Sequence, residues 1–185
     1  MKQEYIFLHH CGYNHSFYTV NKGHKDKGYP KSKLGWNIGY QYYIRNGKIY
    51  RGREENEEGM HNRGYNQNSI AICFDKNHET TPLSNQDKKV AEKLIKEIQK
   101  RHNIPNSKIL GHRETDNTIC PGKYVMEFLN EYRKTTPSTT ETPKTPHKPN
   151  MGELGLLQTQ LNTIKAVLIN LTKKLKEYVN NKKNT

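Results

Sequence analysis

Ser69-Ile-Ala-Ile-Cys-Phe74 is a compact apolar run that predicts a strand in the interior of a sheet. Residues 5–8 are a second short apolar run, which ends in the pair His9-His10 and predicts a buried strand with polar side chains at its C-terminal end. Residues 108–110 predict a third short strand, which leads directly into Gly111-His112. Chemically active side chains are therefore expected to follow buried strands.

A hairpin is predicted between the first two of these strands. Residues 38–45 and 48–51 flank Asn46-Gly47, a pair that suits the two positive-φ positions of a type I′ turn. Residues 11–35 are rich in Gly, Lys, Asn and Tyr, which predicts a long surface loop before the hairpin.

Two helices are predicted in the second half of this region. Ser84 is the expected N-cap of the first, with Asp87 three residues later, and the helix continues to about His102. Pro121 can occupy the first position of the second helix. The expected apolar stripes are Val90, Leu94 and Ile98 in the first helix and Tyr124, Val125, Phe128, Leu129 and Tyr132 in the second. Strands interspersed with helices predict a mixed α/β fold, with a central mixed β-sheet flanked by helices.

The composition changes after residue 134. Residues 1–134 hold the predicted core, whereas residues 135–150 contain four Pro and six Thr and predict an extended linker. Residues 151–185 predict an amphipathic, coiled-coil-like helix that forms a homo-oligomer, because its apolar residues recur at spacings of three and four. A helix that lies on a membrane, or that folds back on residues 1–134, is the alternative. The seam consists of Leu154, Leu157, Leu161, Ile164, Leu168, Leu171, Leu175 and Tyr178.

The chain of 185 residues is strongly basic, with a net charge of +13. Residues 1–134 contribute +8, from 23 Lys and Arg against 15 Asp and Glu, and residues 135–185 contribute +5, from 8 against 3. Such a field attracts nucleic acid, anionic lipid and the phosphate-bearing polymers of bacterial walls alike. The charge therefore does not identify the partner.

Cysteine usage and hydropathy limit the class of protein. Cys11, Cys73 and Cys120 are an odd number at wide spacing, so at least one thiol is expected to be free or bound to metal. No run approaches the ~20 apolar residues of a transmembrane helix, and the N-terminus lacks the apolar core of a signal peptide. We therefore expect synthesis in a cytoplasm.

The strongest local signal for chemistry is His112 followed by Cys120, in GHRETDNTICPG. Zinc favours imidazole and thiolate together, and three protein ligands with an open fourth position are typical of a catalytic site. His9 is the natural third candidate, because it closes a buried strand. Taken alone, the same residues fit a buried cysteine and polar histidines at strand ends.

Four stretches together resemble, in order and spacing, the zinc amidase family that includes phage lysozyme-type amidases and the peptidoglycan recognition proteins. They are FLHH, GWNIGYQYYIRNGKIYRGR, EEGMHNRGYNQNSIAICF and GHRETDNTICPG. The resemblance covers residues 5–132 and implies a mixed sheet with flanking helices. It also implies cleavage of the bond between the lactyl group of N-acetylmuramic acid and L-alanine, so bacterial peptidoglycan is the expected partner.

The resemblance implies that His9, His112 and Cys120 bind a Zn²⁺ cofactor. Such an ion lowers the pKa of a bound water towards ~7 and polarises the scissile carbonyl. The expected reaction is therefore attack by activated water on the amide carbon.

The resemblance also implies roles for three further residues. Tyr40, in GWNIGY, and Thr118 are the expected catalytic residues, placed to orient the water or to stabilise the oxyanion. His61 is expected to contact the substrate. Gln41 stands where the family often has histidine, and Cys11 is an alternative thiol ligand two residues after His9.

The predicted function is a peptidoglycan hydrolase, specifically a phage endolysin made in the host cytoplasm that acts at the cell wall after release. One alternative is a recognition protein that binds peptidoglycan without cutting it, although loss of the ligand cysteine would mark such a protein and Cys120 is present. A second alternative is a basic protein that binds nucleic acid or a polymerase, but the sequence has no interleaved basic and aromatic stacking motif, and no specific nucleic acid is expected.

Deletion of residues 135–185 should reduce the number of subunits in the particle while hydrolysis of small muropeptides is retained. The physical reason is that the heptad seam is the predicted contact between copies. Light scattering coupled to size exclusion measures the mass of each form. An equal number of chains per particle in both forms would contradict the coiled-coil prediction.

Overall fold

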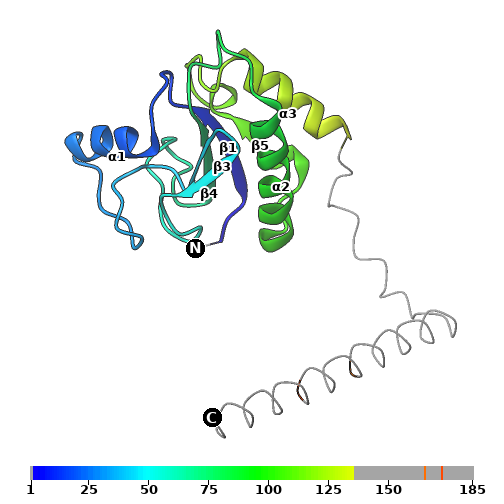
Figure 1. Ribbon diagram of the computed structural model, residues 1–185, viewed down its shortest axis with the longest axis horizontal. Helices are drawn as coiled ribbons and strands as arrows, with labels where there is room; N and C mark the ends of the chain where they lie inside the picture. Colours follow the sequence, from blue (N-terminus) through cyan, green and yellow to red (C-terminus); the bar gives the residue numbers. More distant parts are fainter. Residues whose placement is uncertain (1, 136–164, 166–171, 173–185) are drawn as a thin grey trace, which may run out of the picture. The chain divides into compact units, whose positions relative to one another are not determined.

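The computed structural model describes residues 2–135 together with Lys165 and Thr172. The first of these parts is a mixed α/β fold with a five-stranded sheet and three helices. Figure 1 shows α2 and α3 on one side of the sheet and α1 on the other. The elements are β1 (Tyr5–His10), α1 (Phe17–Asp26), β2 (Tyr42–Arg45), β3 (Lys48–Arg51), β4 (Ser69–Phe74), α2 (Asn85–His102), β5 (Ile109–Gly111) and α3 (Lys123–Thr135), with short 3₁₀ turns at Asn106–Lys108 and His112–Glu114.

The predicted linker, residues 135–150, and the predicted helix, residues 151–185, lie outside the described residues except at three positions. Thr135 ends α3, and Lys165 and Thr172 are helical and exposed. Oligomerisation through the tail therefore stays a prediction. Among the residues described, none of the helices has both the length and the apolar character needed to cross a bilayer.

The sheet has the strand order β3-β2-β4-β1-β5. β1 lies between β4 and β5 and is parallel to both, with His9 opposite Cys73 and Leu8 opposite Gly111. β2 is parallel to β4, and only the β2–β3 hairpin is antiparallel. The C-terminal ends of β1, β4 and β5 therefore meet at one edge, which is where ligands bind in open α/β sheets.

Alternation along the strands divides the buried side chains between the two faces of the sheet. Ile6 and Leu8 of β1 pack with β4 residues Ile70, Ile72 and Phe74 against α2 and α3. The opposite face carries Cys73 of β4 and Tyr43 of β2, which pack with Phe17, Val20 and Ile38. His9 belongs to this second face, because neighbours along a strand point in opposite directions.

Most of the predicted elements are confirmed. β4 has the predicted bounds, and Asn46 and Gly47 both have positive φ, at 52° and 71°. Ser84 caps α2 by accepting a hydrogen bond from Asp87 N at 3.1 Å. β2 is shorter than predicted, because residues 38–41 form a loop in which Gly39 O accepts from Met60 N.

α1 corrects the expectation of an uninterrupted loop over residues 11–35. Ser16 caps this helix by accepting from Thr19 N at 3.1 Å. The helix buries only Phe17 and Val20 in its ten residues. Its sequence therefore lacks the repeated apolar stripe from which helices are recognised.

The start of α3 corrects a second expectation. Pro121 is not the first residue of the helix, which begins at Lys123, because Gly122 has a φ of 86° that no α-helix contains. The Cys120–Pro121 peptide bond is cis. Four of the five residues of the predicted apolar stripe, Val125, Phe128, Leu129 and Tyr132, are buried, whereas Tyr124 is half-buried.

Gly122→Ala should destabilise the fold by more than about 2 kcal/mol, because a Cβ there would lie 2.3 Å from the backbone of His78 in addition to the cost of positive φ. Gly64→Ala is the matched control. Gly64 has the same sign of φ, at 85°, but nothing within 4 Å of the added atom, so it should lose only about 1 kcal/mol. Urea unfolding of both variants measures the difference, and equal losses would contradict the predicted steric contact.

Candidate metal centre

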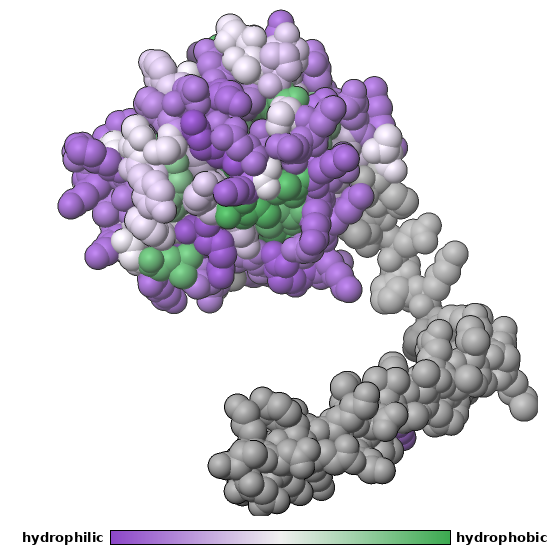
Figure 2. Space-filling view, in the orientation of Figure 1, coloured by the Kyte–Doolittle hydropathy of each residue, from purple (hydrophilic) through white to green (hydrophobic). Residues whose placement is uncertain are grey.

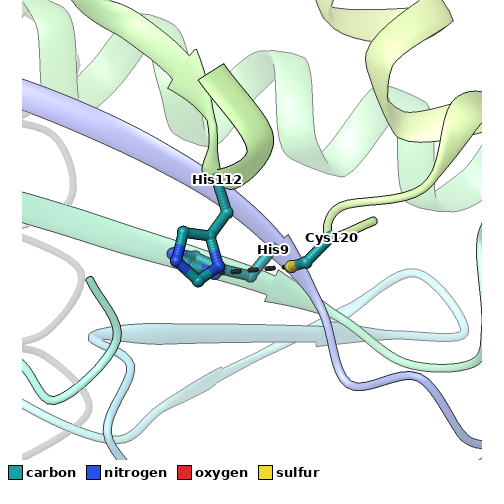
Figure 3. Close-up of side chains that lie close together, drawn as sticks. All are labelled: His9, His112 and Cys120. Carbon is teal, nitrogen blue, oxygen red and sulfur yellow. Dashed lines mark hydrogen bonds between the residues drawn. The ribbon is translucent and has the colours of Figure 1, made fainter. Parts of the chain in front are cut away.

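The three predicted ligands come from three separate segments and meet at the C-terminal edge of the sheet. His9 is in β1 and is 1% exposed. His112 begins the 3₁₀ turn directly after β5, and Cys120 lies in the loop before α3. One donor atom from each lies within 4.8 Å of the others, and Figure 3 shows the three side chains pointing towards one another.

Strand pairing brings the two histidines together. Because Leu8 is opposite Gly111 in the parallel pair of β1 and β5, the next residues, His9 and His112, emerge side by side. Their ring centroids are 4.6 Å apart. Although the two residues are far apart along the chain, their proximity follows from the register of one strand pair.

The loop that carries Cys120 is held closed by hydrogen bonds. Arg113 N donates to Cys120 O at 2.8 Å, and Cys120 N donates to Thr118 Oγ1 at 3.2 Å. His10 N donates to Cys120 Sγ at 3.4 Å. This backbone N–H and the nearby positive charge of Arg113 both favour a thiolate at Cys120.

The spacing of the donor atoms fits a zinc ion. His9 Nδ1 lies 3.6 Å from Cys120 Sγ. Zinc bonds of ~2.0–2.1 Å to nitrogen and ~2.3 Å to sulfur, at a tetrahedral angle, place the two ligands about 3.5 Å apart. Two imidazoles and a thiolate are also a zinc ligand set that leaves a fourth position for water or substrate.

Burial sets the protonation of the three ligands. Burial lowers the pKa of His9 and that of His112 below the usual value, so both imidazoles are neutral at neutral pH. Burial raises the pKa of the Cys120 thiol to about 12, and the His10 N–H offsets part of that shift. Metal binding therefore has to displace one proton, that of Cys120.

Tyr40 lies beside this centre. Its ring centroid is 5.3 Å from that of His9 and 5.5 Å from that of His24. Burial raises the pKa of the Tyr40 phenol well above its usual value, so the hydroxyl keeps its proton and can donate a hydrogen bond. Gln41 does not take part, because its amide is buried between Ala71 N and Glu57 O.

His61 contacts the ring nitrogen of His9 that faces away from Cys120. Its Nδ1 is 3.2 Å from His9 Nε2, and its Nε2 is 3.2 Å from Ser69 Oγ. Both ring nitrogens are therefore engaged within the protein. The contact between His61 and substrate stays a prediction. Neither ring nitrogen of His61 is free to make it in this structure.

The two other cysteines are not among the grouped ligands. Cys73 is fully buried in the core. Cys11 Sγ donates to Tyr13 O at 2.7 Å and accepts from the Tyr43 hydroxyl at 3.5 Å. Cys11 is thus held by neighbouring loop and strand residues, and the three described donors that converge are His9, His112 and Cys120.

Two residues of the centre have no counterpart in the sequence prediction. Asp116 Oδ2 lies 3.5 Å from His112 Nε2, where a carboxylate can orient a metal-binding ring. Ser69 is the second missed residue, because its contact with His61 depends on how the loop between them folds.

The fold and the site together define a class: a mixed α/β domain with a His–His–Cys centre at the C-terminal edge of its sheet. The sequence model described as N-acetylmuramoyl-L-alanine amidase (Amidase_2) matches residues 1–123. The chain therefore belongs to the Amidase_2 family of N-acetylmuramoyl-L-alanine amidases and peptidoglycan recognition protein domains.

The similar proteins include some that are named as amidases and some that are named as recognition proteins. Peptidoglycan-recognition protein SC2 of Drosophila melanogaster is 32% identical over 124 residues, which are 64% of this chain and 67% of the relative. The N-acetylmuramoyl-L-alanine amidase LysC of Clostridium intestinale is similar in structure, with a TM-score of 0.62 and 28% identity over 71% of this chain and 85% of that one. Wild-type Drosophila PGRP-LB matches with a TM-score of 0.54 and 31% identity, over 68% and 79% of the two chains.

Zinc affinity should fall about tenfold for each pH unit lowered between about pH 8 and 7. The sign follows from the pKa values: burial lowers those of His9 and His112, so both imidazoles are neutral in this range, whereas zinc competes with one proton for the Cys120 sulfur. Competition with a chelator of known pH dependence measures the slope. Cys120→Ser should bind weakly with little slope, and a flat profile for the unsubstituted protein would exclude Cys120 as a ligand.

Proposed function

We propose that this chain is a zinc-dependent hydrolase that cuts bacterial peptidoglycan between N-acetylmuramic acid and L-alanine. The observation that carries the proposal is the convergence of His9, His112 and Cys120, whose donor atoms lie within 4.8 Å of one another. Family membership and the likeness to LysC, which is named as an amidase, support it.

The proposed reaction assigns a task to each group around the centre. His9, His112 and Cys120 would hold a zinc ion, which would supply a nucleophilic water at neutral pH and polarise the scissile carbonyl. Tyr40 keeps its phenolic proton and donates a hydrogen bond to the developing oxyanion. Thr118 Oγ1 accepts from Cys120 N, which leaves the hydroxyl proton of Thr118 for the same oxyanion.

A groove beside Tyr40 is the proposed path of the substrate. It has a volume of about 480 Å³ and runs along α1. Lys22 and Lys27 line it together with Asp26, which pairs with Lys22 at 2.6 Å. His24 also lies in the wall, but burial lowers its pKa to about 4, so this ring is neutral. The Lys27 ammonium there suits a carboxylate of a peptidoglycan stem peptide. The position of Tyr40 in the wall of this groove joins substrate binding to the metal centre.

The proposed biological setting is that of a phage endolysin, made in the host cytoplasm and acting at the cell wall after release. The support is the likeness to LysCS of Clostridium intestinale, named as an endolysin, at 28% identity and a TM-score of 0.62. The alternative of a recognition protein that binds without cutting is favoured by the Drosophila relatives. The presence of the thiol ligand favours the enzyme.

Purified protein should release new L-alanine amino groups from cell walls without new reducing sugar ends. Chelation of zinc or Cys120→Ser should abolish the release, because each removes the metal that activates water. Parallel assays for amino groups and reducing ends measure the outcome. Binding to walls without release would identify a recognition protein, and new reducing ends would identify a glycosidase.

Tyr40→Phe separates chemistry from metal binding in the same assay. This variant should keep its zinc but lose about 10²-fold in rate, because one oxyanion donor is removed. Tyr5→Phe is the matched control, since the Tyr5 hydroxyl pairs with Lys108 at the opposite end of β1. Equal rates for Tyr40→Phe and the control would exclude Tyr40 from the reaction.

A further inference from the structure

A line of hydrogen bonds runs from the metal centre into the protein. His9 Nδ1 faces Cys120 Sγ, and His9 Nε2 lies 3.2 Å from His61 Nδ1. His61 Nε2 lies 3.2 Å from Ser69 Oγ, and Ser69 Oγ donates to Tyr65 O at 2.6 Å. The line thus ends on a backbone carbonyl, a group that can only accept.

The Tyr65 carbonyl can only accept, and this fixes which atom carries the proton in each hydrogen bond between Tyr65 and His9. Ser69 gives its single hydroxyl proton to Tyr65 O, so its oxygen accepts from His61 Nε2–H. A neutral His61 ring that is protonated at Nε2 has no proton on Nδ1, so Nδ1 accepts from His9 Nε2–H across their 3.2 Å contact. His9 Nδ1 is left with a bare lone pair directed at the ligand site.

We propose that His61 and Ser69 are positioning residues that hold His9 in the Nε2-protonated tautomer and so prepare its Nδ1 to bind zinc. The proposal rests on the proposed function only in taking zinc as the ion, and it needs no hydrolysis to be tested. In this proposal His61 does not bind the metal but holds the ring of His9 through a hydrogen bond to Nε2.

The surroundings of His61 hold the ring in place. Asn66 Oδ1 accepts from His61 N at 2.9 Å and also from Asn62 N, which fixes the backbone at this position. The rings of His61 and His9 meet edge to face at 5.1 Å. Ser69 is fully buried at the start of β4, so its hydroxyl does not exchange partners with bulk water.

The tautomer is measurable directly in full-length protein stripped of metal with a chelator. Long-range ¹H–¹⁵N spectra distinguish protonated from bare ring nitrogens. His9 and His61 should both be protonated at Nε2 at neutral pH. A predominant Nδ1–H form of His9 would overturn the proposal. If wall hydrolysis fails while this tautomer is found, the proposed function falls and the inference stands.

Zinc affinity of the variants tests the consequence for binding. His61→Phe should weaken zinc about 10- to 100-fold, the usual loss when the partner behind a metal-bound histidine is removed. His61→Asn keeps an acceptor oxygen near the position of Nδ1 and should restore most of the affinity. Equal affinities for the Phe variant and the unsubstituted protein would contradict the assigned role.

Ser69→Ala tests the far end of the line without changing either ring. Loss of the hydroxyl should yield a mixture of His9 tautomers and weaker zinc binding. Ser32→Ala is the matched control, because Ser32 is also buried and its hydroxyl donates to a backbone carbonyl, that of Gly52 at 2.8 Å. A single unchanged tautomer in Ser69→Ala, with zinc affinity equal to that of the control, would overturn the proposal.

Discussion

The parallel pairing of β1 with β5 is the constraint on which the site depends. It sets Leu8 opposite Gly111, so that His9 and His112 leave the sheet as neighbours. Because β1 lies between β4 and β5 and its residues Ile6, Phe7 and Leu8 are fully buried, a shift of one residue would turn its core side chains to the wrong face. The hydrophobic core therefore fixes the positions of the two imidazoles.

Burial at this edge has opposite effects on the two kinds of ligand. It favours neutral imidazoles, which are already in the form that binds a metal, but it also favours the protonated thiol of Cys120. A divalent cation removes that conflict by replacing the thiol proton. Burial alone would disfavour the thiolate that a metal needs. The N–H of His10 offsets part of this cost, because it already donates a hydrogen bond to the Cys120 sulfur.

Much of the fold could be predicted from the sequence, because its central strands and α2 have clear apolar patterns and end signals. α1 could not, since only Phe17 and Val20 of its ten residues are buried. The three candidate ligands are named by resemblance to a family. Their convergence depends on the register of β1 with β5 for the two histidines and on a hydrogen-bonded loop for Cys120. Contacts such as those of His61 with His9 and Ser69 depend on the folding of a loop, and no local pattern indicates them.

X-ray absorption at the zinc edge of the purified full-length protein tests the account most directly. The account predicts one zinc per chain, bound by one sulfur at about 2.3 Å and two imidazole nitrogens at about 2.0–2.1 Å, with a lighter atom completing the shell. A coordination shell without sulfur, or protein that binds no zinc after loading, would contradict it.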